Sequence, residues 1–137
     1  MLNKKIKSKV VLLLLTAFIC ITITACNNSD DASKALITGI WELSSAKVAD
    51  QEITRDDFLK QMNLNSFPQI IFYEDNTVSI EIFGEAKKSK WSDDGDGVYT
   101  IKDSDNSSDL QVNLENNQLL FSQSGITLVF EKQKSAD

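Results

Sequence analysis

The stretch LQVNLENNQLLFSQSGITLVFEK, residues 110–132, decides the fold class of this 137-residue chain. Apolar and polar side chains alternate along it, as in Leu110-Gln111-Val112, with the period of two that is typical of β-strands. Two turn signals, Asn116-Asn117 and Ser124-Gly125, interrupt the alternation. The stretch therefore predicts three antiparallel strands, each with one face toward a core and one toward water: residues 109–115, 118–123 and 126–132.

The same period continues upstream as far as Gly39, with acidic or glycine-containing turns between the apolar runs. Eight short strands in sequential hairpins predict an all-β fold, either an eight-stranded antiparallel up-and-down barrel or an open curved meander. Closure is favoured because it removes two exposed sheet edges, and strands this short leave an interior that is mostly filled. The five further strands are expected at 40–48, 69–74, 78–83, 88–92 and 97–102.

One segment has helical periodicity instead. Thr54 can cap a helix, two aspartates follow it, and Phe58, Leu59 and Met62 fall on one face. We expect a short amphipathic helix over 55–62, between the first and second strands, that lies over one mouth of the sheet. The alternative is an irregular loop that buries the same three apolar side chains.

The chain begins with a basic head and an apolar run. Four lysines lie within residues 1–9, and Val10–Ala25 is apolar apart from three threonines. Sixteen residues are few for crossing a hydrocarbon core of about 30 Å. The pattern therefore predicts a secretory signal peptide that is cleaved off, with a permanent membrane anchor as the alternative.

The motif Ile23-Thr24-Ala25-Cys26 resembles the lipobox of bacterial lipoproteins. The resemblance implies that Cys26 receives a diacylglycerol, that residues 1–25 are removed, and that the new amine is acylated, for example with palmitate. The thiolate is the nucleophile that this chemistry needs, and two or more acyl chains hold a protein firmly at a membrane. We therefore expect the chain on the extracytoplasmic face of the cell membrane, with 26–35 as a lipidated, solvated tether.

The two cysteines, Cys20 and Cys26, have separate predicted fates. Cys20 is removed with the signal peptide, and the Cys26 thiol is modified by lipid. No disulfide can then form, so the fold must be stabilised by its core alone. A Cys20–Cys26 disulfide is the alternative, but it would bridge a segment that cleavage divides.

Charge and composition exclude several activities. The chain has 14 basic and 20 acidic residues and no histidine. Since residues 1–25 hold four lysines and no acid, residues 26–137 carry 10 basic and 20 acidic groups, a net charge of −10. Histidine-dependent nucleophiles and imidazole metal ligands are absent, and phosphate backbones would be repelled. We expect no enzyme activity, no catalytic residues, no metal, no cofactor and no nucleic-acid partner.

Gly39-Ile40-Trp41 at the start of the first strand resembles the Gly-x-Trp pattern of lipocalins and of lipocalin-like domains in small bacterial lipoproteins. The resemblance covers about residues 36–132 and implies a lipocalin-like β-domain over 36–134. It further implies that Gly39, Trp41 and a late basic residue, Lys132 or Lys134, close one end of the barrel. Three further segments also resemble lipocalin-like domains: Ile71–Val78, Lys90-Trp91 and Leu128–Lys132.

Five aromatic residues in the predicted strands are candidates for lining a ligand cavity, with plain core packing as the favoured alternative. Ser45 and Thr100 are the polar residues that the alternation offers to orient a ligand, and the ligand-binding residues are otherwise unknown. The five aromatic residues are Trp41, Phe72, Trp91, Phe121 and Phe130.

The charged segments have simple interpretations. Asp93-Asp94-Gly95-Asp96-Gly97 suggests a calcium site, but strand residues follow it, so a solvated hairpin turn is preferred. Asp103, Asp105 and Asp109 form a second acidic turn. Lys87-Lys88-Ser89-Lys90 is a basic spot in an acidic body, interpreted as exposed surface or as a contact with anionic lipid head groups.

These features favour a membrane-tethered, non-catalytic binding module for a small or peptidic ligand. The main alternatives are an immunity-type lipoprotein that intercepts cationic antimicrobial peptides, which an acidic body would attract, and a structural lipoprotein that contacts envelope proteins. A released signal peptide that acts as a messenger is a further alternative.

Overall fold

The computed structural model describes residues 29–82, 84–102 and 108–134, except for the side chains of Ser29 and Asp30. The chain divides into two compact units, Met1–Ala32 and Ser33–Asp137. Within the first unit only residues 29–32 are described, and they are helical. The predicted signal peptide and the lipobox lie outside the described residues.

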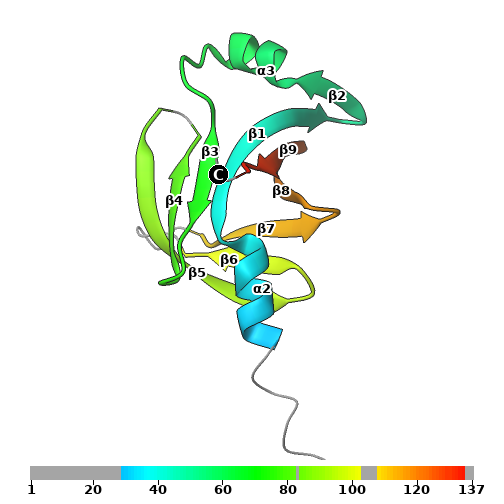
Figure 1. Cartoon of the computed structure of the whole chain (residues 1–137). Helices are drawn as coiled ribbons and strands as arrows, with labels where there is room; N and C mark the ends of the chain where they lie inside the picture. The colour runs from blue at the N-terminus through cyan, green and yellow to red at the C-terminus, as the bar shows by residue number, and fades with distance from the viewer. Residues whose placement is uncertain (1–28, 83, 103–107, 135–137) are drawn as a thin grey trace, which may run out of the picture. The chain divides into compact units, whose positions relative to one another are not determined.

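The described residues contain two helices and nine strands, joined by turns and short irregular segments. Figure 1 shows their arrangement. The helices are α2 (Ser29–Ile37) and α3 (Arg55–Met62). The strands are β1 (Gly39–Val48), β2 (Gln51–Thr54), β3 (Gln69–Phe72), β4 (Thr77–Glu81), β5 (Ala86–Gly95), β6 (Val98–Ile101), β7 (Leu110–Glu115), β8 (Gln118–Gln123) and β9 (Ile126–Lys132).

The second unit is a closed antiparallel barrel of eight strands, which confirms the predicted fold class. The strands pair in the order β1-β3-β4-β5-β6-β7-β8-β9, and β9 pairs back onto β1. The hairpins turn where Asn, Asp, Ser or Gly occurs, for example at Asn116-Asn117, whose φ angles are 51° and 63°. The sheet therefore follows the local hairpins that the alternation predicts.

Strand β1 pairs with three other strands. Its first four residues pair with β3, its last four pair with β2, and its other edge pairs with β9 from Trp41 to Val48. A β-bulge between Leu43 and Ser45 shifts the register against β9. Because a bulge bends a strand and increases its twist, it lets β1 follow the curve of the barrel.

Two elements have no counterpart in the sequence prediction. β2 has four residues, of which only Ile53 is half-buried, so it carries too little alternation to be recognised. From Ser29 onward, the segment predicted as a solvated tether is helical. Its composition is that of a linker, but Ile37 at its C-terminal end is fully buried in the core.

Helix α3 covers the residues predicted for it. The Asp57 backbone N–H donates to the Thr54 side chain at 3.2 Å, and Asn63 ends the helix in the left-handed conformation. Phe58 is buried, and Met62 is exposed. Neither described helix has the length and apolar content required to cross a bilayer.

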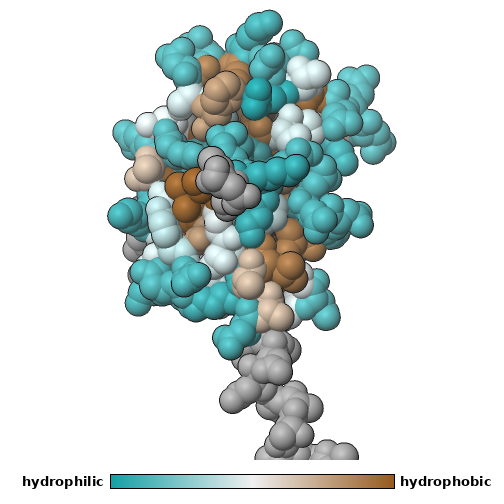
Figure 2. Space-filling view, in the orientation of Figure 1, coloured by the Kyte–Doolittle hydropathy of each residue, from teal (hydrophilic) through white to brown (hydrophobic). Residues whose placement is uncertain are grey.

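The barrel interior is a single packed core. Strand partners such as Leu43 with Phe130 and Val112 with Phe121 point to the same inner side and are buried. Figure 2 shows that hydrophilic residues cover most of the face seen there, with hydrophobic residues in small separate groups. The largest fully buried side chains are those of Trp41, Tyr99, Phe72 and Phe130.

Candidate functional site

One end of the barrel is closed by Trp41 and Lys132, which are partners in the pairing of β1 with β9. The Lys132 Nζ lies 5.7 Å from the centroid of the Trp41 ring, a cation–π contact. The Trp41 Nε1 donates a hydrogen bond of 2.8 Å to the Ile37 carbonyl. Trp41 therefore connects the end of α2 to the start of the barrel.

Lys132 also caps the C-terminal end of α2. Its Nζ donates to the Leu36 carbonyl at 3.0 Å and to the Ala35 carbonyl at 3.4 Å. Carbonyls in a last helical turn have no partner within the helix, and a cation there complements the negative end of the helix dipole. Partial burial lowers the pKa of Lys132, so these contacts are made by an ammonium group that has lost part of its water.

Gly39 leaves the space that Lys132 occupies. A Cβ added at this position would lie 2.7 Å from the Lys132 Cε, and the φ angle of +130° is one that side chains rarely adopt. The structure thus brings Gly39, Trp41 and Lys132 together at one end. Of the two lysines that the lipocalin resemblance offers, Lys132 and Lys134, it is Lys132 that lies over Trp41.

Polar contacts attach the C-terminal half of α2 to β5, to β6 and to the turn between β3 and β4 at this closed end. The Ser33 hydroxyl lies 3.1 Å from the Tyr99 hydroxyl and donates to the Asp93 carboxylate. The Lys34 Nζ donates to the Asn76 side chain at 2.7 Å. From Ser33 onward the chain is therefore part of the closed end.

An aromatic cluster fills the interior next to the closed end. Phe72 and Trp91 pack edge to face with their centroids 5.6 Å apart, and Tyr99 lies 5.9 Å from Trp91. The Trp91 Nε1 donates to the Tyr73 carbonyl at 3.2 Å, which satisfies its polar atom. Of the five aromatic ligand candidates, Trp41, Phe72, Trp91 and Phe130 are therefore plain core.

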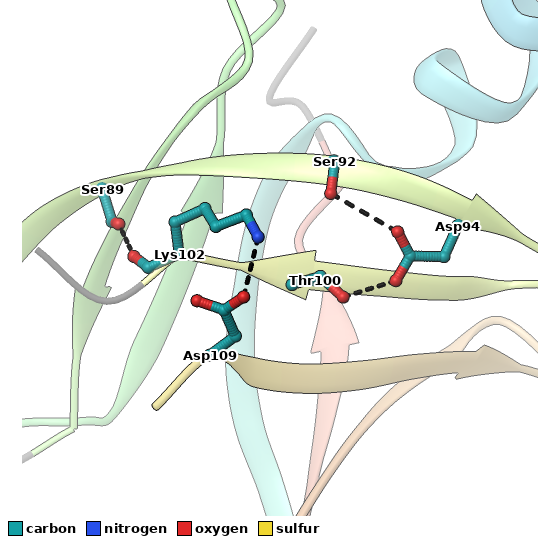
Figure 3. A network of polar contacts seen from close by, with 6 residues as sticks. All are labelled: Ser89, Ser92, Asp94, Thr100, Lys102 and Asp109. Carbon is teal, nitrogen blue, oxygen red and sulfur yellow. Dashed lines mark hydrogen bonds and ion pairs between the residues drawn. The ribbon is translucent and has the colours of Figure 1, made fainter. Parts of the chain in front are cut away.

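Ser45 and Thr100 do not face the interior, so their prediction as inward polar groups is wrong. The bulge after Leu43 reverses the alternation in β1, so that Ala46 points inward and Ser45 donates to Glu52 at 2.8 Å. In β6 the inward residues are the neighbours of Thr100, whose hydroxyl donates to Asp94 on the outer face (Figure 3).

The opposite mouth, beneath α3, contains an apolar pocket of about 90 Å³ that is open on one side. Phe58 and Met62 line it from α3, and Phe121 is the one aromatic candidate that contributes. Sequence reasoning did not find this site, because its walls come from segments that only the tertiary fold brings together. The other lining residues are Ile82, Gln123, Ile126 and Leu128.

The size of this mouth pocket limits what it can hold. Pockets that enclose a drug-sized ligand usually have roughly 300–1,000 Å³. About 90 Å³ fits one apolar side chain or a short end of an acyl chain, and the remainder of any ligand stays outside. Gln123 is the polar side chain among the residues that line it.

A larger, polar groove of about 430 Å³ lies on the outer wall between β1, β9 and the start of α3. Glu42 and Glu131 line it and stand directly opposite each other across the two strands. Like charges in this position repel, and a cationic group between them relieves the repulsion. Arg55 also lines the groove, but its guanidinium lies 4.5 Å from the Phe67 ring centroid and beside Asp56.

The carboxylates of Asp93 and Asp94 in the first acidic segment accept hydrogen bonds from neighbouring residues of β5 and β6. Asp93 accepts from the Gly95 backbone N–H at 2.8 Å, and Asp94 accepts from Thr100 and Ser92. The hairpin from β5 to β6 forms as predicted, and among the described residues no group of three or more Cys, Asp or Glu is placed to hold a metal ion.

The second predicted acidic turn is described only at Asp109, because Asp103 and Asp105 lie outside the described residues. The Lys102 Nζ donates to Asp109 at 2.7 Å (Figure 3), and this carboxylate raises the pKa of Lys102. The basic spot at Lys87, Lys88 and Lys90 lies along β5, exposed to solvent.

No protein-family model matches the chain, and no curated protein matches it.

We predict that Gly39→Ala destabilises the barrel by about 1–3 kcal/mol, because the new Cβ both meets Lys132 and forces a strained φ. In the Gly39→Ala/Lys132→Ala double variant the close contact disappears and only the backbone strain remains. The two substitutions should therefore be non-additive in chemical denaturation. Additive losses would show that the Lys132 stem does not occupy the space beside residue 39.

Proposed function

We propose that this chain is a bacterial lipoprotein, lipidated at Cys26 and held on the extracytoplasmic face of the cell membrane, whose barrel is a non-catalytic binding module. The basic head, the apolar run and the lipobox-like motif before Cys26 support the anchor. The closed barrel is compatible with binding a small ligand. Its ligand is expected to be a small molecule or a peptide.

The apolar pocket at the α3 mouth is the observation that supports binding most directly. Most of the core is sealed, but Met62 is exposed and Ile126 is partly exposed beside the pocket. Leaving apolar surface in a concave site costs stability, at roughly 25 cal/mol per Å², and a ligand that covers it recovers this free energy. We infer that the pocket holds the apolar end of a ligand whose polar part remains at the rim.

The groove with Glu42 and Glu131 favours a second candidate, interception of cationic peptides. A lysine or arginine side chain placed between the two carboxylates would relieve their repulsion, and the net charge of −10 over residues 26–137 would attract such a peptide. A structural role in the envelope has no comparable observation in its favour.

The anchor is tested by replacing Cys26. In a bacterial host that processes lipoproteins, the parent chain should yield a product that begins at Cys26 and carries the added lipid mass, found in the membrane fraction. Cys26→Ser should abolish the lipid mass and the cleavage, whereas the matched control Cys20→Ser should change neither. An uncleaved, unmodified parent chain in intact-mass analysis would refute the lipidation.

The pocket is tested with N-acetyl-leucinamide, a probe with one apolar side chain, in an NMR titration. We expect the methyl signals of Ile82, Ile126 and Leu128 to shift. Met62→Glu should weaken binding by about fivefold or more, because it places a charge beside the apolar pocket. Tyr73→Glu adds the same charge at an exposed site at the closed end and should leave binding unchanged. Equal effects of both variants, or no methyl shifts, would exclude the pocket as the site.

The cationic-peptide candidate is tested with a short polylysine peptide at low salt. Glu131→Gln should reduce its affinity several-fold, and added salt should weaken binding further because exposed charges are screened. Glu85→Gln, an equal change of charge at an exposed residue between β4 and β5 that does not line the groove, is the matched control. If both variants lose the same affinity, only net charge matters and the groove has no specific role.

A further inference from the structure

We infer that the barrel faces the membrane with its closed end and opens its apolar pocket away from the bilayer, so that the ligand is captured from the surrounding fluid and not from the anchoring membrane. This inference rests on the lipidation at Cys26 proposed above. It adds an orientation and a source of ligand, neither of which follows from the anchor alone.

The chain joins the barrel through contacts of Ser33 and Lys34. Ser33 contacts Asp93 and Tyr99 near the hairpin between β5 and β6, and Lys34 contacts Asn76 in the turn between β3 and β4. Lys132 holds the carbonyls at the end of the same helix. The attachment therefore reaches the barrel at its closed end, through several contacts that restrict pivoting about a single residue.

The attachment between Cys26 and the barrel has a short reach. Seven residue steps separate Cys26 from Ser33, which span at most about 25 Å when fully extended. Because the chain is helical from Ser29, where the rise falls to about 1.5 Å per residue, the reach shortens to about 16 Å. A lipid chain at Cys26 thus keeps the closed end close to the bilayer.

The barrel is taller than this attachment is long. The ten residues of β1 run from the closed end to the α3 mouth and span about 30 Å along the strand, or about 23 Å along the axis of a barrel with typical tilt. An attachment of about 16 Å is shorter than this height. It cannot fold back along the wall far enough to turn the mouth toward the bilayer.

The competing orientation is flat adsorption through the β5 wall. Lys88 and Lys90 are exposed there, and such lysines are attracted to anionic lipid. The closed-end turns carry Glu74, Asp75 and Asp96, so electrostatic attraction does not press this end onto an anionic surface. The length and position of the attachment, which salt does not alter, exclude an inverted barrel, and the label distances described below distinguish the upright barrel from the flat one.

The orientation determines how a ligand arrives. A pocket of about 90 Å³ that faces the fluid meets dissolved peptides and small molecules with an accessible apolar group. A lipid of the anchoring membrane would have to leave the bilayer and cross the height of the barrel to reach it. We therefore assign the pocket to an apolar side chain or chain end of a dissolved ligand.

The test uses the full chain, processed in its host, purified from membranes and reconstituted into vesicles of phosphatidylglycerol and phosphatidylcholine. Lipid consumes Cys26, and Cys20 leaves with the signal peptide, so a single introduced cysteine carries the spin label. Three exposed sites are compared. They are Glu74→Cys at the closed end, Lys88→Cys on the wall and Lys60→Cys on α3.

We expect the Glu74 label to lie nearest the bilayer, the Lys88 label farther away and the Lys60 label farthest, as measured by relaxation from a lipid-bound paramagnetic reagent. The order should persist at high salt. A Lys60 label as close as the Glu74 label, or a Lys88 label that is nearest at low salt, would overturn the orientation and leave the anchor intact. Protein that does not partition into vesicles because it lacks lipid would overturn the anchor and the orientation together.

Discussion

The pairing of β9 with β1 is the interaction on which the rest of the barrel depends. It converts a meander with two exposed edges into a closed sheet, and its register runs from Trp41 with Lys132 to Val48 with Ile126. The first pair forms the closed end, and the last lies beside the apolar pocket. A slip of one residue would turn Phe130 and its inward neighbours toward water, so both ends depend on the same alignment.

The two ends of the barrel are filled differently. Aromatic rings occupy the closed end, and their polar atoms are satisfied by backbone or by α2, as with the Tyr99 hydroxyl and Ser33. Aliphatic side chains and Phe121 surround the other mouth, where α3 inserts Phe58 and leaves space beside it. Aromatic rings with satisfied polar atoms fill the closed end, whereas the α3 mouth keeps a pocket of about 90 Å³ among its apolar side chains.

Local pattern explains which parts of the fold were predictable. The hairpins from β7 to β9 combine a period of two with turn residues that tolerate positive φ, and α3 carries its own cap, Thr54. β2 and α2 depend on distant partners: Lys132 contacts α2 across 96 positions of sequence. The error at Ser45 has a specific cause, because one bulged residue reverses the alternation and no local signal marks the bulge.

The candidate site was predictable only in part for the same reason. Gly39 and Trp41 are neighbours in sequence, so their pattern could be recognised, and the resemblance supplied Lys132 as a partner. The mouth pocket combines side chains from α3, the end of β4 and the hairpin from β8 to β9, and none of these segments differs in sequence from an ordinary core segment. Its existence depends on how far α3 lies from the hairpin, which is a property of the folded barrel.

The burial of Ile37 has a consequence for proteolysis. Because this side chain is fully buried and Ser33 is already bonded to the barrel, the contacts of the barrel extend to residues that precede its first strand. A protease that cuts between Ser33 and Gly39 would separate these contacts from the barrel, whereas a cut ahead of Ser33 would leave them intact. The fragment from Ser33 onward would then keep the closed end, the core and the α3 mouth.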